Sequence, residues 1–240
     1  ATTIVVSAQR VSKEFLEAWR AAGASPQEQK LTLVRRGTSL GSIDLIAAQE
    51  LGIDVVNTPG VNSPHVAQFV VETLGLHEPL ADPKAAKAVV VGAGSVGQSV
   101  IRLLSNVGVA PIVVSRSPES PSLDAALRGA THVAVCAATS SEPILTAAHI
   151  TALLAGEKRT IEICSVSRPD AFSLEAIMMV AQEKERAQLR FDYGESILAP
   201  TRQKVNQDGV RENITWSSNA MGSEACKQDL DAAVLRILQT

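Results

Sequence analysis

The chain has 240 residues and a formal net charge of −3 at pH 7, with 45% hydrophobic but only 3% aromatic residues. A chain of this length buries a substantial core, as one large domain or as two small ones. The charge balance, without a basic cluster, argues against a nucleic-acid partner. We find no apolar segment long enough to span a bilayer and no charged-then-apolar leader at the N-terminus. We therefore expect a cytoplasmic protein with no membrane partner.

The cysteines give no sign of a disulfide framework or a metal site. Cys136, Cys164 and Cys226 are odd in number and far apart in the sequence. No pair of cysteines has the spacing of a zinc site, and no cysteine is grouped with histidines in such a pattern. We expect reduced thiols and no metal.

The first part of the chain alternates short apolar runs with amphipathic segments. We expect strands at 3–6, 31–34 and 55–56, and helices at 12–22, 45–51 and 66–74. Residues 1–80 are predicted to form a small α/β domain. The segment 77–84, which contains Pro79 and Pro83, is the expected link to the next domain.

A glycine-rich turn follows the most apolar strand of the chain. Residues 88–91 read AVVV, a run typical of a buried parallel strand, and Gly92, Gly94 and Gly97 follow in the spacing GxGxxG. Gly92 permits a tight turn, Gly94 lets a pyrophosphate approach the backbone, and Gly97 lets the next helix pack near the strand. The free N–H groups at the start of that helix, around Ser95 and Val96, then face the phosphates.

The context of these glycines favours dinucleotide binding over a purely structural turn. Apolar residues at helical spacing follow the turn, Gly108 ends the predicted helix, and residues 112–114 form a second buried strand. This βαβ unit is the setting that the motif requires. The sequence therefore predicts a Rossmann domain over residues 84–221.

The end of the second strand indicates which dinucleotide binds. An NAD site usually has an acidic residue here, whereas this chain has Ser115, Arg116 and Ser117, with no acid before Glu119. Arg116 is suited to pair with a 2′-phosphate, and the two hydroxyls are suited to donate to it. NADP is therefore the first choice and NAD the second. The alternative is that Arg116 is an ordinary solvated loop residue.

Strands and helices continue to alternate to the end of the chain. We expect strands at 132–136, 160–164, 189–192 and 213–217, and helices at 123–128, 147–154, 174–185 and 222–238. Residues 194–212 are predicted to be a long polar excursion. The alternation predicts an α/β fold with a doubly wound parallel sheet. The closing helix is a candidate to pack back on the smaller first domain.

Three stretches of the chain, in order, resemble the D-isomer-specific 2-hydroxyacid dehydrogenase family. The first runs from Arg36 to Ser63, the second is the glycine turn, and the third is Ser165-x-Ser167-Arg168. The resemblance implies a substrate domain and an NAD(P) domain. It also implies hydride transfer between a nicotinamide and a small 2-oxo or 2-hydroxy acid, with an Arg binding the acid and a His–Glu pair supplying the proton.

The resemblance also implies roles for individual residues. Arg168 lies at the position of the catalytic Arg, and Asn219 and Glu195 lie at or near the positions of the proton-donating pair. Cofactor contacts fall on the glycine turn, on the segment after the second strand and on three residues after later strands, Ala137, Thr139 and Ser165. Contacts to the substrate carboxylate fall on Gly37, Thr38, Ser39 and Asn62.

The chain departs from the family at the catalytic pair. Asn219 stands where the family has His, and an amide cannot give up a proton near neutral pH. The family's Glu lies five residues after an Asp at a strand end. Here that Asp is Asp192 and the fifth position is Ile197, so Glu195 is out of register. Pro169 also replaces a family Gly, and the link before Lys84 is too short for the arm that usually makes the family's homodimer.

Three functions remain open from the sequence. The first is an NADP(H)-dependent oxidoreductase acting on a small carboxylate, with the proton supplied by water or by another group such as His65. The second is a nucleotide-binding homologue without catalysis. The third is a tailoring enzyme with altered chemistry on a carboxylate, in which Asn219 orients the substrate.

Overall fold

The computed structural model describes residues 2–7, 9–22, 30–82, 85–139, 141–155, 159–207, 209–220 and 222–239. The chain forms two compact units, Ala1–Asn62 with Ser223–Thr240 and Ser63–Gly222. The sequence places the boundary near residue 80, but the structure groups α3 (Ser63–Thr73) with the second unit. The reason is packing, since α3 lies against α4 (Ser95–Asn106), the helix of the glycine turn.

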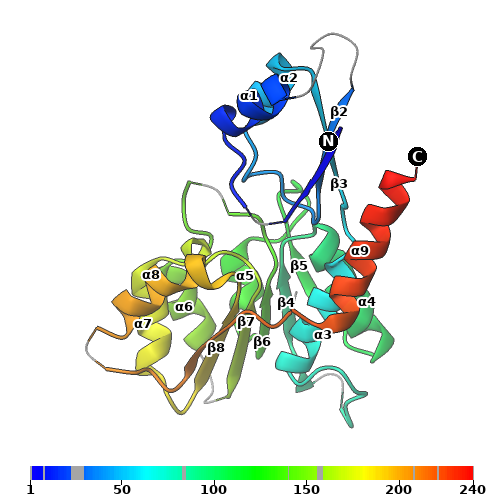
Figure 1. Ribbon diagram of the computed structural model, residues 1–240. Helices are drawn as coiled ribbons and strands as arrows, with labels where there is room; N and C mark the ends of the chain where they lie inside the picture. Colours follow the sequence, from blue (N-terminus) through cyan, green and yellow to red (C-terminus); the bar gives the residue numbers. More distant parts are fainter. Residues whose placement is uncertain are drawn as a thin grey trace. The chain divides into compact units, whose positions relative to one another are not determined.

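The first unit contains a three-stranded parallel sheet, two helices that share its core, and the C-terminal helix. Its strands are β1 (Thr3–Val6), β2 (Leu31–Arg35) and β3 (Ile53–Asn57), in the order β1-β2-β3. Its helices are α1 (Lys13–Ala22), α2 (Leu45–Glu50) and the C-terminal α9 (Glu224–Leu238). Leu16 and Trp19 of α1 and Ala47 of α2 share a core with Leu31 and Leu33 of the sheet. Figure 1 labels these helices and strands.

The second unit is built on a six-stranded sheet. Its strands are β4 (Ala88–Val91), β5 (Ile112–Val114), β6 (His132–Val135), β7 (Ile161–Ser165), β8 (Ala187–Asp192) and β9 (Ile214–Ser217). They lie in the order β5-β4-β6-β7-β8-β9, and every pairing is parallel. This arrangement confirms the predicted doubly wound α/β fold.

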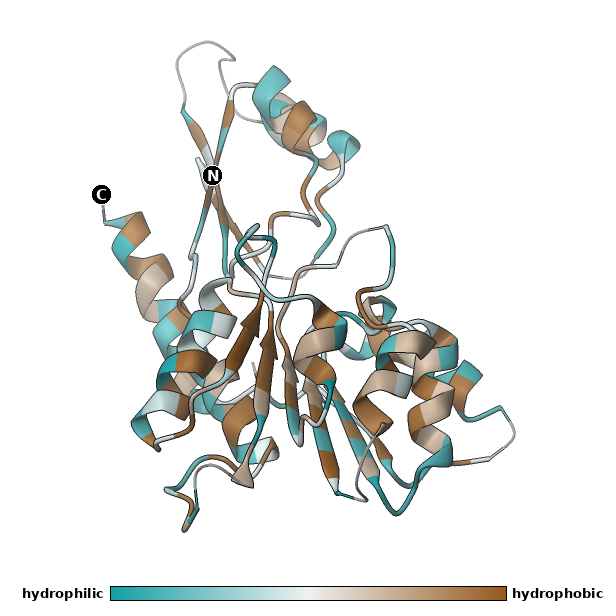
Figure 2. Ribbon diagram, turned by 180° about the vertical axis from the view of Figure 1, so that it is seen from behind, coloured by the Kyte–Doolittle hydropathy of each residue, from teal (hydrophilic) through white to brown (hydrophobic). Residues whose placement is uncertain are grey.

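The alternation of side chains along β4 explains why both faces of this sheet are covered. Val89 and Val91 belong to a core formed with α5 (Leu123–Leu127), α6 (Ala147–Leu154), α7 (Leu174–Gln182) and α8 (Glu195–Val205). Ala88 and Val90 belong to a second core formed with α3 and α4. Successive residues of a strand point to opposite faces, so a strand between two helical layers is apolar throughout. Figures 1 and 2 show these layers and the hydrophobic central strands.

Helix α8 corrects one prediction from the sequence. Residues 194–212 are predicted as an irregular polar excursion, but Glu195–Val205 is helical. Pro200 lies inside the helix, and few apolar residues mark its buried face, so the usual helical signals are weak. Leu198 and Val205 are nevertheless buried in the core beneath it.

Among the helices that the structure describes, none is both long enough and apolar enough to cross a bilayer.

Candidate functional site

The carboxyl ends of the parallel strands bring most of the predicted residues to one edge of the six-stranded sheet. The loops after β4, β5, β6 and β7 carry, in that order, the glycine turn, Ser115–Ser117, Ala137–Thr139 and Ser165–Arg168. Strand β4 lies between β5 and β6, so the connections after β4 and β5 take the chain to opposite sides of it. Ligands of open α/β sheets bind at such a point, outside the carboxyl ends of the strands.

Two of the three glycines are required by the fold itself. Gly92 has φ 102°, and a Cβ there would lie 2.6 Å from the Cα of Ala137. A Cβ on Gly97 would lie 1.8 Å from the carbonyl oxygen of Gly92. Gly92 therefore allows the glycine turn after β4 to lie close to the loop after β6, and Gly97 allows α4 to pack onto the turn.

Gly94 differs from the other two glycines because it faces open space. A Cβ at this position would have no protein atom within 4 Å, and the backbone, at φ −74° and ψ −172°, is extended. The fold therefore gives no reason for a glycine here. A ligand that lies against the backbone would give a reason for a glycine at this position, and the predicted pyrophosphate is such a ligand.

Helix α4 also begins without a side-chain cap. Gly94 is its N-cap and makes no side-chain hydrogen bond, whereas Ser122, Ser173 and Ser223 cap α5, α7 and α9 through their hydroxyls. Ser95 in the first turn of α4 is exposed and Val96 is half-buried. The first N–H groups of α4 are thus free to bind an anion. The residues present fit the pyrophosphate of a dinucleotide.

The loop after β5 presents Arg116 to solvent. The N–H of Ser115 donates to Ser120 Oγ at 2.9 Å, and the N–H of Ser117 donates to Ser115 Oγ at 3.2 Å. Arg116 lies between these two serines, is exposed, and has no ion pair within the residues that the structure describes. The two serines therefore shape the loop, and the guanidinium of Arg116 is available to a ligand.

A serine pair ties the loops after β6 and β7 together. Ser167 Oγ donates to the carbonyl of Ala137 at 2.7 Å and to that of Val135 at 3.2 Å. Ser165 has no exposed surface, and its Oγ donates to the carbonyl of Ser167 at 3.5 Å. The hydroxyl of Ser165 is thus buried inside the turn, and the predicted cofactor contact of this residue stays a prediction. Thr139 and Ala137 keep partly exposed side chains at the same edge.

Arg168 lies directly after this turn, and its side chain has a partner that was not predicted. Its Nε donates to Asp170 Oδ2 at 3.0 Å, and the Arg168 side chain remains 45% exposed. Pro169 begins the short 3-10 helix Pro169–Ala171, so its fixed φ suits this position in place of the family's glycine. The two terminal nitrogens of the guanidinium are left for a ligand.

The loop after β9 is held by a buried carboxylate. Asp192, at the end of β8, accepts hydrogen bonds from Ser217 Oγ at 2.9 Å, Asn219 N at 2.5 Å and Ala220 N at 2.9 Å. Asp192 is only 6% exposed, whereas the side chain of Asn219 is exposed. The sequence analysis assigns no site role to Asp192. An acidic residue at the end of an apolar strand is the pattern that could have pointed to it.

In the first unit, three of the residues predicted to bind the substrate carboxylate, Gly37, Thr38 and Ser39, lie in the loop after β2, and the fourth, Asn62, lies in the loop after β3. Gly37 is buried with φ 134°, and its N–H donates to Thr58 Oγ1 at 2.8 Å. Thr38 Oγ1 donates to Asn62 Oδ1 at 3.1 Å and accepts from Gly60 N at 3.2 Å. The N–H of Gly37 is therefore not free for a ligand.

Thr38 and Ser39 keep the accessible donors of this loop. Both residues are exposed, and their N–H groups have no acceptor among the described residues. The Asn57 side chain donates to the carbonyl of Thr38 at 2.7 Å, which fixes the peptide that precedes Ser39. Two adjacent free N–H groups on a fixed loop form a small site suited to a carboxylate.

The comparisons with known proteins identify the family. The profile of the D-isomer specific 2-hydroxyacid dehydrogenase catalytic domain matches residues 2–225. The chain belongs to this family. Its recognition from the three sequence stretches is thereby confirmed.

Solved structures of this family share the fold. The NAD+-bound 3-phosphoglycerate dehydrogenase of Entamoeba histolytica has a TM-score of 0.71 and 17% identity, over 98% of this chain and 78% of that one. D-lactate dehydrogenase of Escherichia coli has a TM-score of 0.75 and 15% identity, over 99% and 82%. The Aquifex aeolicus D-lactate dehydrogenase, complexed with NAD and lactic acid, gives 0.74 and 14%, over 100% and 82%. No curated protein sequence matches the chain.

The sequence resemblance puts Asn219 where the family has its proton-donating His and Glu195 near the position of its Glu, and both assignments stay predictions. Glu195 begins α8, and its carboxylate pairs with Arg202 of the same helix. His65 lies in the first turns of α3 rather than on a loop at the sheet edge. No group of three metal-binding side chains occurs within the described ranges of the chain.

Proposed function

We propose that this 2-hydroxyacid dehydrogenase homologue is an NADP(H)-dependent oxidoreductase acting on a small 2-oxo or 2-hydroxy acid. One observation carries the proposal: α4 begins uncapped at Gly94, in open space beside the switch point of the sheet. The family match supports oxidoreductase chemistry on a CH–OH group with an NAD-type cofactor. The phosphate type and the substrate are our proposals.

The choice of NADP rests on the loop after β5. Arg116 is exposed between two serines, and no carboxylate of the described residues pairs with it. A 2′-phosphate would offer the guanidinium a charge-assisted partner, whereas a ribose 2′-hydroxyl would not. We therefore place NADP first and NAD second.

The chemistry proposed for the second unit centres on Arg168. Nicotinamide, when bound, supplies or accepts the hydride. The guanidinium of Arg168 binds the oxygen atoms of the 2-oxo acid and polarises the carbonyl, so that its carbon accepts the hydride and its oxygen accepts a proton. Because the amide of Asn219 cannot release a proton, we assign the proton to water and give Asn219 the role of orienting the carbonyl by a hydrogen bond.

In the first unit, we propose that the N–H groups of Thr38 and Ser39 bind a carboxylate. They are exposed, unpaired within the described residues and held by Asn57. Asn62 contributes indirectly, because its side-chain oxygen accepts a hydrogen bond from the hydroxyl of Thr38.

The test is substrate-dependent oxidation of NADPH with a panel of glyoxylate, pyruvate and 2-oxoglutarate. We expect turnover with at least one acid and a loss of about a hundredfold or more in kcat/KM for Arg168→Ala. Asp170→Ala is the matched control, because it removes the partner of Arg168 and leaves the guanidinium in place. Equal activity of wild type and Arg168→Ala would refute the role of Arg168.

A non-catalytic, nucleotide-binding homologue is the second candidate. The observation that favours it is the state of the catalytic pair, with Asn219 in place of His and Glu195 paired with Arg202. Asn219→His separates the two candidates. A gain in 2-oxo acid reduction over an inactive wild type would indicate an otherwise intact site that has lost its acid.

A further inference from the structure

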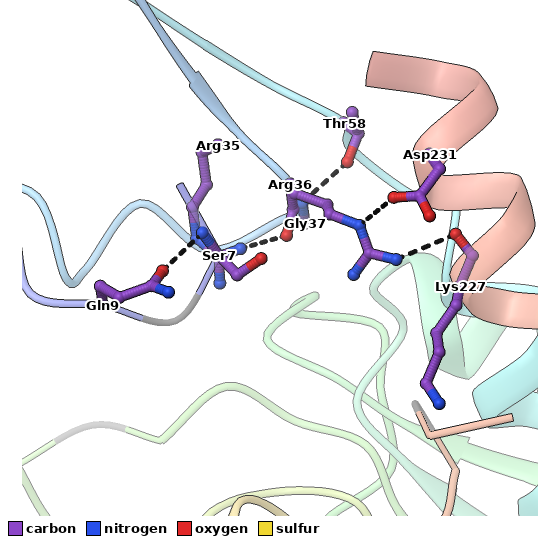
Figure 3. A network of polar contacts seen from close by, with 8 residues as sticks. All are labelled: Ser7, Gln9, Arg35, Arg36, Gly37, Thr58, Lys227 and Asp231. Carbon is purple, nitrogen blue, oxygen red and sulfur yellow. Dashed lines mark hydrogen bonds and ion pairs between the residues drawn. The ribbon is translucent and has the colours of Figure 1, made fainter. Parts of the chain in front are cut away.

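Arg36 is the residue at which two strands of the first unit and the C-terminal helix meet. Its N–H donates to the carbonyl of Val6, at the end of β1, at 2.8 Å. Its own carbonyl accepts a hydrogen bond from the guanidinium of Arg35, the last residue of β2. Figure 3 shows this part of the structure. The backbone of Arg36 is thus fixed on both sides of its Cα.

The side chain of Arg36 reaches α9 with two donors. Its Nε donates to Asp231 Oδ1, and its Nη2 donates to the carbonyl of Lys227 at 2.9 Å (Figure 3). The Arg36 side chain is 22% exposed and that of Asp231 is 62% exposed. An isolated exposed ion pair contributes little. Here the planar guanidinium binds a carboxylate and a helix carbonyl together, which fixes its orientation as well as its position.

The polar contacts continue from Arg36 into the loop proposed to bind the carboxylate. Gly37 follows Arg36 and exchanges two hydrogen bonds with Thr58, N–H to Oγ1 at 2.8 Å and Thr58 N–H to the Gly37 carbonyl at 3.3 Å. Thr38 is joined in turn to Asn62 and Gly60. One unbroken series of contacts therefore runs from α9 through Arg36 to the free N–H groups of Thr38 and Ser39.

We propose that Arg36 is a positioning residue through which α9 fixes the Thr38–Ser39 loop for the carboxylate of the substrate. The identity of the ligand rests on the proposed function, but the link between α9 and the loop does not. Arg36 does not touch the substrate in this proposal. Both of its guanidinium contacts are to α9, and its effect passes through Gly37.

Hydrogen exchange of the full chain, followed by NMR without any ligand, tests the link. The reporters are the bonded N–H groups of Gly37, Thr58 and Gly60. We expect Arg36→Ala and Asp231→Ala each to accelerate their exchange about tenfold, because the loop opens locally without unfolding the unit. Glu224→Ala is the matched control, since it removes another exposed carboxylate of α9 that pairs with Lys227 and not with Arg36. Unchanged exchange in Asp231→Ala would overturn the proposal.

Kinetics tests the consequence for the substrate. For the preferred 2-oxo acid of the panel, Arg36→Ala and Asp231→Ala should raise KM about tenfold, while kcat and the Kd of NADPH stay within about twofold. The double variant should match Arg36→Ala, because Asp231 acts on the loop only through the guanidinium of Arg36. Additive effects, or a loss confined to kcat, would overturn the positioning role. An inactive wild type would instead refute the proposed function and leave the exchange result to decide the link.

Discussion

At the scale of single residues, the glycine turn separates what the fold requires from what a ligand requires. A Cβ at Gly97 would collide with the Gly92 carbonyl at 1.8 Å, whereas a Cβ at Gly94 would meet nothing within 4 Å. The motif is one pattern in the sequence, but its glycines have different physical reasons. Only the structure tells them apart, because the distances depend on how closely α4 and the loop after β6 approach the turn.

This difference predicts opposite results for two similar substitutions. Gly97→Ala should lower the free energy of unfolding by on the order of 3 kcal/mol, because backbone atoms must move to admit the methyl group. Gly94→Ala should change it by less than about 0.5 kcal/mol and should weaken the binding of NADPH about tenfold or more. Chemical denaturation and calorimetric titration measure the two quantities. Full binding by a stable Gly94→Ala protein would contradict a pyrophosphate at this position.

At the scale of elements, the sequence predicts the second unit best where physical constraints are local. The buried strands β4, β6 and β7 are marked by apolar residues, and α5 and α7 begin at serines that cap them. Helix α8 is missed because Pro200 and a polar composition hide its few buried residues. The hydrogen bonds that the buried carboxylate of Asp192 accepts come from the loop after β9, and no local pattern records such a contact between segments.

Pro200 itself gives a prediction for α8. It lies in the interior of the helix and is exposed, so the missing N–H leaves a hydrogen bond unmade without a packing benefit. Pro200→Ala should raise the free energy of unfolding by about 1–3 kcal/mol. Pro64→Ala serves as the control, because Pro64 is exposed in the first turn of α3, where a proline removes no helical bond. A destabilised Pro200→Ala protein would show that the proline has a structural role in α8.

At the scale of the whole molecule, two cysteine thiols link stability to pH, one in the partly buried Cys136 and one in the buried Cys164. Burial raises the pKa of Cys136 to about 12 and also raises the pKa of Cys164, which has no exposed surface. The unfolded chain loses these protons near pH 8.5. The raised pKa values therefore stabilise the folded state fully below about pH 8.5. This stabilisation is lost as the pH rises toward 12.

The expected result is a free energy of unfolding that falls above about pH 8.5 by about 1.4 kcal/mol per pH unit for each buried thiol. Denaturation of wild type and of Cys136→Ala/Cys164→Ala at a series of pH values measures it. The free energy of unfolding of the variant should fall less steeply with pH than that of the wild type, whatever the absolute stability of the variant. Identical slopes would mean that both thiols ionise in the folded protein as they do in the unfolded chain.

The proposed function of the whole chain depends first on a nucleotide bound at the carboxyl edge of the six-stranded sheet. Calorimetric titration of NADPH and of NADH into wild type and Arg116→Ala tests this most directly. We predict that NADPH binds the wild type at least about tenfold more tightly than NADH, and that Arg116→Ala removes the difference without abolishing binding. Binding of neither nucleotide to the folded wild type would contradict the central claim, and the glycine turn would then be part of the scaffold alone.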